Sequence, residues 1–313
     1  MKILLSTSAG ARAKYEAAFA AALPQARFFW RDAADTAVNP HAEQADYAIV
    51  WKPAAAVLAE QRSLQAVFNL GAGVDALLAL PSLPADLPLF RLEDAGMAQP
   101  MARYALAAVM RHELRFDTYA VEQAQLRWSP AAPRQAATMK VGVLGLGAIG
   151  GVIARTLVAA GYSVRGYSRS PRALDGVACL AGSQLDEFFT GLDALVSILP
   201  LTRDTEGLLN RQRLSRLAHG AHLVNLGRGA HLVDADLIAL LDSGQLGGAT
   251  LDVFATEPLP CQHPFWSRPE ILITPHVSGL TPVDAAVRQV AAKLLGFVGG
   301  AAVSGQVDRQ RGY

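Results

Sequence analysis

Short apolar runs alternate with amphipathic segments along the first hundred residues of the chain. The apolar runs have the length of buried strands, and they are residues 2–6, 45–51, 66–70 and 88–92. Between them, residues 12–23 carry apolar side chains at helical spacing up to Pro24, and Pro53 can open a second helix. Strands that alternate with helices in this way predict a parallel α/β layer.

A second series of the same kind follows a long predicted helix. This helix runs from Gly96 toward Arg127 and carries on one face Met101, Tyr104, Ala108, Val109 and Phe116. A loop rich in Pro, Ala and Ser follows over residues 128–138. The predicted strands after it are residues 139–144, 163–167, 194–199, 221–226, 248–254 and 271–274, and a last helix spans 282–297. Boundaries between two α/β domains are therefore expected near residues 98 and 279.

Composition narrows the class of protein. With 313 residues, of which 51% are apolar and 18% charged, the chain is long enough for about two folded domains. A formal net charge of +1 gives no reason to expect nucleic acid or an anionic membrane surface as a partner. Cys179 and Cys261 are too far apart in sequence for a CxxC pair, so neither a disulfide framework nor a metal site is indicated. Because no apolar run reaches about 18 residues, a soluble, cytoplasmic protein is expected.

The strongest local motif is a GxGxxG turn that follows the apolar run 139–144. Gly145 permits the tight turn, Gly147 lets the backbone approach a diphosphate, and Gly150 allows close packing of helix on strand. Ala148 and Ile149 complete the motif at the start of a helix, whose free N–H groups favour negative charge. The motif predicts a dinucleotide site, and an ordinary glycine-rich turn is the alternative.

The end of the next strand indicates which dinucleotide. An NAD-specific site usually has Asp or Glu there, to hold the ribose 2′-hydroxyl. This chain has Ser168 and Arg169 instead, followed by Arg172. Because arginine pairs with a 2′-phosphate through charge-assisted hydrogen bonds, we expect NADP(H), with NADPH preferred over NADH. A pair of solvated surface arginines is the alternative.

Polar residues follow three of the later strands, where ligands bind in open α/β sheets. They are Arg228, Glu257 and His276. His276 suits a proton donor to a carbonyl oxygen, and Glu257 could orient its imidazole. Arg228 suits a substrate carboxylate and the charge that develops on the carbonyl oxygen. The set predicts reduction of a 2-keto acid. A turn arginine, a loop carboxylate and a surface histidine are the alternatives; most of the other histidines are expected to be solvated or capping residues.

Together these segments resemble the D-2-hydroxyacid dehydrogenase family. The run Pro88 to Met97 and the tail Gly305 to Tyr313 are similar to its glyoxylate/hydroxypyruvate reductase A branch, as are Asn69 to Asp75 and Leu251 to Pro260. The resemblance covers essentially the whole chain. It implies a Rossmann-type doubly wound dinucleotide-binding domain over 99–279. A flavodoxin-like substrate domain would comprise 1–98 together with the C-terminal helix and tail, 280–313.

The resemblance also implies further roles. The loop Gly71-Ala72-Gly73 would bind the substrate carboxylate through N–H groups, and Trp51 would line the substrate pocket. Positions implied to face the cofactor are Leu199, Pro200, Thr205, Gly227 and Asp252. A homodimer would form through the helix after Gly96, with Trp128 reaching the partner's site. A strand–helix turn at 71–73, core or interface tryptophans and a buried capping role for Asp252 remain alternatives.

The sequence therefore predicts an NADPH-dependent reductase of glyoxylate, hydroxypyruvate or a related small 2-keto acid. Two alternatives stay open. The same chemistry on a bulkier 2-keto acid such as phenylpyruvate would keep all three polar residues. A nucleotide-sensing binding protein on the same fold would not need them.

Overall fold

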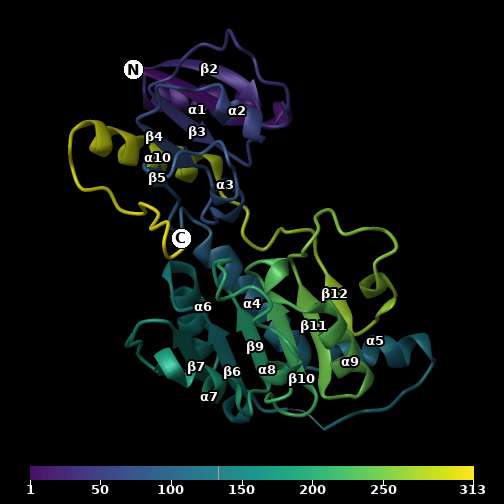
Figure 1. The fold of residues 1–313 in the computed structure, drawn as a ribbon. Coiled ribbons are helices and arrows are strands. Elements are labelled where there is room, and N and C mark those ends of the chain that lie inside the picture. The colour runs from purple at the N-terminus through teal and green to yellow at the C-terminus, as the bar shows by residue number, and fades with distance from the viewer. Residues whose placement is uncertain (133) are drawn as a thin grey trace. The chain divides into compact units, whose positions relative to one another are not determined.

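The computed structural model describes residues 1–132 and 134–313, so that Pro133, in the predicted loop 128–138, lies outside the described residues. The chain divides into two compact units (Figure 1). Unit 1 comprises Met1–Gly96 and Thr281–Tyr313, and unit 2 comprises Met97–Leu280. The chain therefore leaves the first unit once and returns to it for the last helix.

Unit 1 is built on a parallel sheet with the strand order β2-β1-β3-β4-β5. Its strands are β1 (Lys2–Thr7), β2 (Arg27–Asp32), β3 (Tyr47–Val50), β4 (Ala66–Asn69) and β5 (Leu89–Phe90). Its helices are α1 (Arg12–Ala22), α2 (Ala55–Ala59), α3 (Asp75–Leu78) and α10 (Val283–Val298). The order 2-1-3-4-5 is that of flavodoxin-like doubly wound sheets.

Both faces of this sheet are buried, which explains why its strands read as continuous apolar runs. Ile3 and Leu5 pack with α1 and α10, whereas Leu4 between them packs with α2 on the opposite face. Tyr47 and Ala48 divide between the two faces in the same way. The alternation follows from the two-residue period of a strand.

One strand of this sheet, β2, was not predicted. It pairs with β1 alone, at the edge, and its residues Phe28, Phe29 and Trp30 are only half-buried. Its sequence therefore lacks the uniformly apolar character of an inner strand. At the other edge, Val307 N–H donates to Leu89 O at 2.8 Å, so the C-terminal tail is bound to β5.

Unit 2 is built on a seven-stranded parallel sheet with the order β12-β11-β10-β9-β6-β7-β8. Its strands are β6 (Lys140–Leu144), β7 (Ser163–Ser168), β8 (Val177–Ala181), β9 (Ala194–Ser197), β10 (Ala221–Asn225), β11 (Leu246–Leu251) and β12 (Ile271–Ile273). Its helices are α4 (Ala98–Glu113), α5 (Phe116–Ala124), α6 (Ala148–Ala159), α7 (Leu185–Phe189), α8 (Arg211–Leu214) and α9 (Asp234–Asp242). This is the Rossmann strand order extended by one strand, and the direction of winding reverses between β6 and β9.

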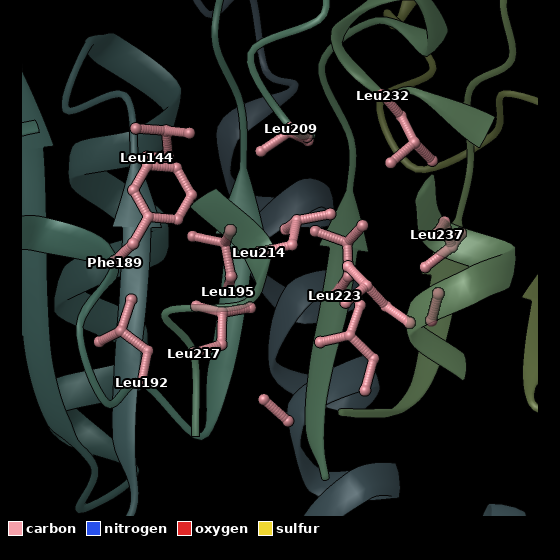
Figure 2. Packing of buried hydrophobic residues seen from close by; sticks show 14 of the residues in the cluster. Leu144, Phe189, Leu192, Leu195, Leu209, Leu214, Leu217, Leu223, Leu232 and Leu237 are labelled. Atoms are coloured by element: carbon pink, nitrogen blue, oxygen red, sulfur yellow. The ribbon is translucent and has the colours of Figure 1, made fainter. Parts of the chain in front are cut away.

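A leucine-rich layer covers one face of this sheet (Figure 2). Leu195 of β9 and Leu223 of β10 pack there with Phe189 of α7, Leu214 of α8 and Leu237 of α9. This layer fixes the strands whose carboxyl ends carry the polar residues considered below. One strand under it, the edge strand β8, was not predicted, because Leu180 is its single buried residue.

The long helix predicted after Gly96 is in fact two helices. It is interrupted between α4 and α5 at Arg115, which has the left-handed φ of 57° that no helix residue adopts. Met101, Ala108 and Val109 lie on the buried face of α4 as predicted. Phe116 does not, since it starts α5 and is 55% exposed. The break escaped prediction because the helical period of apolar residues continues past it and no Gly or Pro marks it in the sequence.

Three histidines, His112, His222 and His231, are buried instead of solvated, and the first two of them form a pair. His112 of α4 and His222 of β10 stack with ring centroids 5.0 Å apart. Nε2 of His222 lies 2.9 Å from the hydroxyl of Thr250. Burial lowers the pKa of His112 to about 2 and that of His222 to about 3, and neighbouring positive charge from Arg134 acts in the same direction. Both rings are therefore neutral in the folded protein at ordinary pH.

Over residues 1–132 and 134–313, the helices are too short or too polar for any of them to traverse a bilayer.

Candidate active site

The turn between β6 and α6 has the geometry that a dinucleotide diphosphate requires. Gly145 has a φ of +108°, and a Cβ on Gly150 would lie 1.7 Å from the carbonyl oxygen of Gly145. Only glycine fits at either position. A Cβ on Gly147, by contrast, would meet no atom within 4 Å, so this glycine faces open space at the start of α6. The first-turn N–H groups of α6, which include Ala148 and Ile149, have no acceptor within the helix. The turn therefore fits a diphosphate.

The turn lies against the carboxyl end of β9, at the point where the sheet reverses its winding. A Cβ on Gly145 would be 3.1 Å from the carbonyl oxygen of Ile198 and 3.2 Å from Cδ2 of Leu199. The next residue, Pro200, accepts a hydrogen bond from the Thr205 hydroxyl at 2.8 Å. The Thr205 oxygen in turn accepts from Thr202 N–H at 2.8 Å. Leu199 and Pro200 are thus placed beside the glycine turn, while the Thr205 hydroxyl shapes their loop.

The end of β7 carries no carboxylate. The Ser168 hydroxyl donates to Ser170 O at 2.7 Å, which closes a small turn. Arg169 lies within this turn and Arg172 two residues beyond it, and both residues are exposed. The neighbouring strand β6 leads into the glycine turn, so the arginines lie at the same carboxyl edge of the sheet as the diphosphate site. This edge has the charge that a 2′-phosphate requires.

Arg228 lies between two glycines that the surrounding backbone makes necessary. A Cβ on Gly227 would lie 2.9 Å from Leu199 O, and one on Gly229 would lie 1.8 Å from the carbonyl carbon of Phe254. The segment is therefore wedged between the loops after β9 and β11. Asn225 Nδ2 donates to Arg228 O at 3.0 Å, and Arg228 Nη1 donates to Gly227 O at 2.8 Å. These contacts fix the backbone at Arg228; its contact with substrate stays a prediction.

Glu257 and His276 form a pair, although 19 positions separate them. Nδ1 of His276 lies 2.9 Å from Oε2 and 3.1 Å from Oε1 of Glu257. Oε1 also accepts from Phe254 N–H at 3.1 Å, which fixes the carboxylate. Since Nδ1 faces the carboxylate, Nε2 is the nitrogen left for other chemistry. The side chain of His276 is 40% exposed, so a ligand can reach it.

Asp252 holds the loop that carries His276. Its buried carboxylate accepts from the Thr274 hydroxyl at 2.6 Å, from Val277 N–H at 2.8 Å and from Ser278 N–H at 2.9 Å. These bonds bracket His276, whose φ of 54° is unusual for a residue other than glycine. The structure thus places Asp252 in the capping role that the sequence analysis left open; contact with a cofactor remains a prediction.

The residues expected to bind the substrate carboxylate lie in unit 1, at the carboxyl ends of β3 and β4. The Trp51 ring covers Gly71 so closely that a Cβ there would lie 2.0 Å from Cζ3 of the indole. Asn69 Nδ2 donates to Gly71 O at 3.0 Å and to Gly73 O at 2.8 Å. Because the carbonyl and the N–H of one trans peptide group point in opposite directions, the Ala72 N–H, which shares its peptide with Gly71 O, faces away from Asn69. Binding of the substrate carboxylate by Ala72 and Gly73 stays a prediction.

Two residues near Arg228 were missed from the sequence. Asn225 holds the Arg228 carbonyl, and His231 accepts a hydrogen bond from Arg228 N–H. A polar residue at the end of an apolar strand was a signal for Asn225. For His231 the only signal was its position three residues after Arg228, which is weak. No group of three or more His, Cys, Asp or Glu side chains suited to a metal ion occurs in the described part of the chain.

Comparison with known proteins places this geometry in a family. Residues 105–278 match the model of the D-isomer specific 2-hydroxyacid dehydrogenase NAD binding domain. A glyoxylate/hydroxypyruvate reductase A of Serratia proteamaculans is 48% identical over 275 residues, which are 86% of this chain and 88% of that protein. The reductase of the same name from Yersinia enterocolitica is 44% identical over 277 residues, 87% of this chain and 88% of its own.

Solved structures agree over the full length. A D-isomer specific 2-hydroxyacid dehydrogenase from Xanthobacter autotrophicus in complex with NADPH and MES has a TM-score of 0.92 and 41% identity, with 99% of each chain covered. An NADPH-dependent glyoxylate/hydroxypyruvate reductase from Sinorhizobium meliloti in complex with NADP and sulfate has a TM-score of 0.91 and 35% identity, covering 100% of this chain and 99% of that one. The chain therefore belongs to the D-isomer specific 2-hydroxyacid dehydrogenase family.

Proposed function

We propose that this protein is an NADPH-dependent reductase that converts glyoxylate to glycolate and hydroxypyruvate to D-glycerate. The observation that carries the proposal is the Glu257–His276 pair, at 2.9 Å, on the same sheet edge as Arg228 and the glycine turn. An acid, a cation and a dinucleotide site are the parts that reduction of a 2-keto acid requires. The names of the bacterial relatives, glyoxylate/hydroxypyruvate reductase A, support the substrate class.

NADP is the cofactor that the residues suit. The glycine turn 145–150 and the first turn of α6 would hold the diphosphate, and Leu199, Pro200, Gly227 and Asp252 would line the remainder of its site. Ser168 and Arg169 would bind the 2′-phosphate. When bound, the reduced nicotinamide supplies the hydride. The complexes of structural neighbours with NADPH and NADP support this assignment.

His276 acts as the general acid. Because its Nδ1 is held by Glu257, its Nε2 is the atom that delivers a proton to the substrate oxygen. The carboxylate orients the ring through the two contacts with Nδ1. Proton transfer from a positioned side chain typically accelerates a reaction by about 10²- to 10⁴-fold. Arg228 binds the substrate and stabilises negative charge that develops on its oxygen.

Unit 1 supplies the substrate-binding residues in this proposal. The N–H groups of Ala72 and Gly73 bind the substrate carboxylate, and the indole of Trp51 lines the pocket. Unit 1 is then the substrate domain and unit 2 the dinucleotide-binding domain. Their limits in the structure, Met1–Gly96 with Thr281–Tyr313 and Met97–Leu280, differ by two residues or fewer from the boundaries expected at 98 and 279.

The protein is proposed to be a cytoplasmic homodimer. Large apolar side chains are exposed along one stretch of unit 2, from Phe116 at 55% to Leu126 at 95% and Trp128 at 97%. Exposed apolar side chains in such number mark interaction surfaces. A second copy is the partner that the resemblance implies, with Trp128 reaching toward the partner's site. Analytical ultracentrifugation tests this: a dimer is expected, and Trp128→Asp together with Leu126→Asp should produce monomers.

The test of the reaction is loss of nicotinamide absorbance, with NADPH and NADH each supplied with glyoxylate, hydroxypyruvate, pyruvate and phenylpyruvate. Rapid oxidation of NADPH with the first two acids is expected. His276→Asn is the matched control, since asparagine tolerates the left-handed backbone at this position but cannot serve as the acid. Activity with phenylpyruvate alone would overturn the substrate assignment. Tight NADPH binding without any reduction would indicate a nucleotide sensor.

A further inference from the structure

His231 is a buried titratable residue for which the reaction above has no use. It lies three residues after Arg228, in the short turn Gly229–His231, and its side chain is 0% exposed. Its Nδ1 lies 3.2 Å from Arg228 N, which donates to it. Its Nε2 lies 3.3 Å from the carbonyl oxygen of Pro200. The ring therefore bridges the Arg228 segment and the loop after β9.

These two partners fix the form of the ring. Arg228 N–H can only donate, so Nδ1 must be the acceptor. Pro200 O can only accept, so Nε2 must carry the proton. The ring is also confined, because a Cβ on Gly227 would lie 3.0 Å from both Cε1 and Nδ1. A glycine at 227 thus allows the neutral imidazole to reach the Arg228 peptide.

The bond from Arg228 N–H reaches the guanidinium through a single peptide plane. Arg228 N and Gly227 O belong to the same planar peptide group. Its N–H is held by His231, and its carbonyl oxygen accepts from Arg228 Nη1 at 2.8 Å. If the peptide rotates, the acceptor that holds the guanidinium rotates with it. By holding this peptide group, the His231 imidazole restrains the orientation of the Arg228 guanidinium.

On its other side His231 reaches the loop 200–205. Pro200 O also accepts from the Thr205 hydroxyl at 2.8 Å, so the same carbonyl oxygen is held twice. The backbone next to His231 is tied to the chain beyond this loop, since Leu209 N donates to His231 O at 2.8 Å. Pro200 and its neighbour Leu199 are the residues proposed to face the cofactor.

We propose that His231 is a positioning residue that couples the substrate-binding Arg228 to the cofactor-lining loop at Pro200. The coupling runs from Pro200 O through the neutral imidazole to the Gly227–Arg228 peptide and on to the guanidinium. It rests on the proposed function for what Arg228 and Pro200 bind. An apolar side chain would fill the same space at a lower cost in folding free energy, since each buried polar atom requires a hydrogen-bond partner.

Two substitutions separate the two hydrogen bonds. In His231→Gln, the side-chain nitrogen can occupy the position of Nε2 and donate to Pro200 O, but nothing replaces Nδ1. In His231→Asn, the side-chain oxygen can occupy the position of Nδ1 and accept from Arg228 N–H, but the side chain is too short for Pro200. His219→Asn, at an exposed histidine of the same unit, is the control.

The measurements are kcat and KM for glyoxylate at saturating NADPH, and the dissociation constant of NADPH from the fluorescence of the bound nucleotide. His231→Gln is expected to raise KM for glyoxylate about tenfold, the effect of one lost hydrogen bond near a charge, with NADPH binding unchanged. His231→Asn is expected to weaken NADPH binding several-fold, with KM for glyoxylate close to that of the wild type. His219→Asn should change neither quantity.

A double-mutant cycle excludes a purely structural role. In an Arg228→Ala background, His231→Gln should cause no further loss of kcat/KM, because no guanidinium remains to be positioned. An additional loss of the same size there, or equal loss of both quantities in both His231 variants, would overturn the proposal. So would wild-type values in both. A wild type that reduces no 2-keto acid would instead refute the proposed function, and the NADPH dissociation constant of His231→Asn would still decide whether the Pro200 contact serves the cofactor.

Discussion

Both carboxylate oxygens of Glu257 face Nδ1 of His276, at 2.9 and 3.1 Å. The two residues come from different loops, after β11 and after β12, and residues of the segment after β11 hold both of them. Phe254 N–H holds the carboxylate, whereas Asp252 holds the backbone around the histidine. The imidazole is therefore oriented before any substrate arrives, which leaves Nε2 as the nitrogen that meets the ligand.

Glu257→Gln tests the charge in this pair. The amide can keep one hydrogen bond to Nδ1 but carries no negative charge beside the proton-donating ring, so kcat for glyoxylate is expected to fall by about 10- to 100-fold. NADPH binding should be unchanged, since neither Glu257 nor His276 is among the residues proposed to hold the cofactor. Stopped-flow or steady-state assays at pH 7 give kcat, and Glu16→Gln on the surface of α1 is the control. A wild-type kcat would remove Glu257 from the mechanism.

Arg169→Asp tests how the cofactor is chosen. Aspartate would repel a 2′-phosphate and could accept from a ribose 2′-hydroxyl, as in NAD-specific sites. The ratio of kcat/KM for NADPH to that for NADH is expected to fall by about 10- to 100-fold, the equivalent of one charge-assisted hydrogen bond. Arg172→Asp, three residues further on, should have a smaller effect. If Arg172→Asp had the larger effect, Arg172 would be the residue that reads the phosphate.

The inner strands and the site motifs could be predicted from the sequence because their physical requirements are local. A buried parallel strand such as β3 needs an apolar run, and the turn at Gly145 needs glycine. The edge strands β2 and β8 escaped prediction, since a half-exposed strand carries mixed residues. The break at Arg115 escaped because the helical period continues on both sides of it.

In the site, too, some residues have a local sequence signal and others do not. Arg228, Glu257 and His276 could be found because each follows an apolar strand, and the pairing of Glu257 with His276 followed from their chemistry. The roles of Asp252 and His231 depend on which backbone groups they face, and those groups belong to other loops. No local pattern carries that information.

The stacked pair His112 and His222 predicts how stability depends on pH. Burial lowers their pKa values to about 2 and about 3, well below the value of about 6.5 expected in the unfolded chain. Below pH 6.5 the unfolded chain binds more protons than the native state, so the stabilisation from keeping both rings neutral is complete above that pH and is lost as pH falls. The limiting slope is about 1.4 kcal/mol per pH unit for each histidine.

Urea unfolding at pH 7.5, 6.0 and 5.0 measures this slope. His112→Gln combined with His222→Gln removes both titrating rings while keeping polar side chains, so the free energy of unfolding should fall less steeply with acidification than in the wild type. The absolute stability of the double variant at pH 7.5 is expected to be lower, because the stacked rings are lost. Equal slopes in the two proteins would show that other groups govern the acid sensitivity.

Two glycines of the β6–α6 turn separate the requirements of folding from those of the cofactor. In Gly150→Ala the new methyl group would lie 1.7 Å from Gly145 O, a backbone atom that cannot move without displacing α6 from β6. The melting temperature without nucleotide is therefore expected to fall, by an amount that corresponds to about 1–3 kcal/mol or more.

In Gly147→Ala the methyl group would meet nothing within 4 Å, and the φ of −72° suits alanine, so the melting temperature should not change. The methyl group would stand where a diphosphate approaches the backbone, however, and NADPH binding should weaken at least about tenfold. Thermal unfolding without nucleotide and fluorescence titration with NADPH give the two quantities for each variant. Normal NADPH binding by Gly147→Ala would mean that the diphosphate does not lie at this turn.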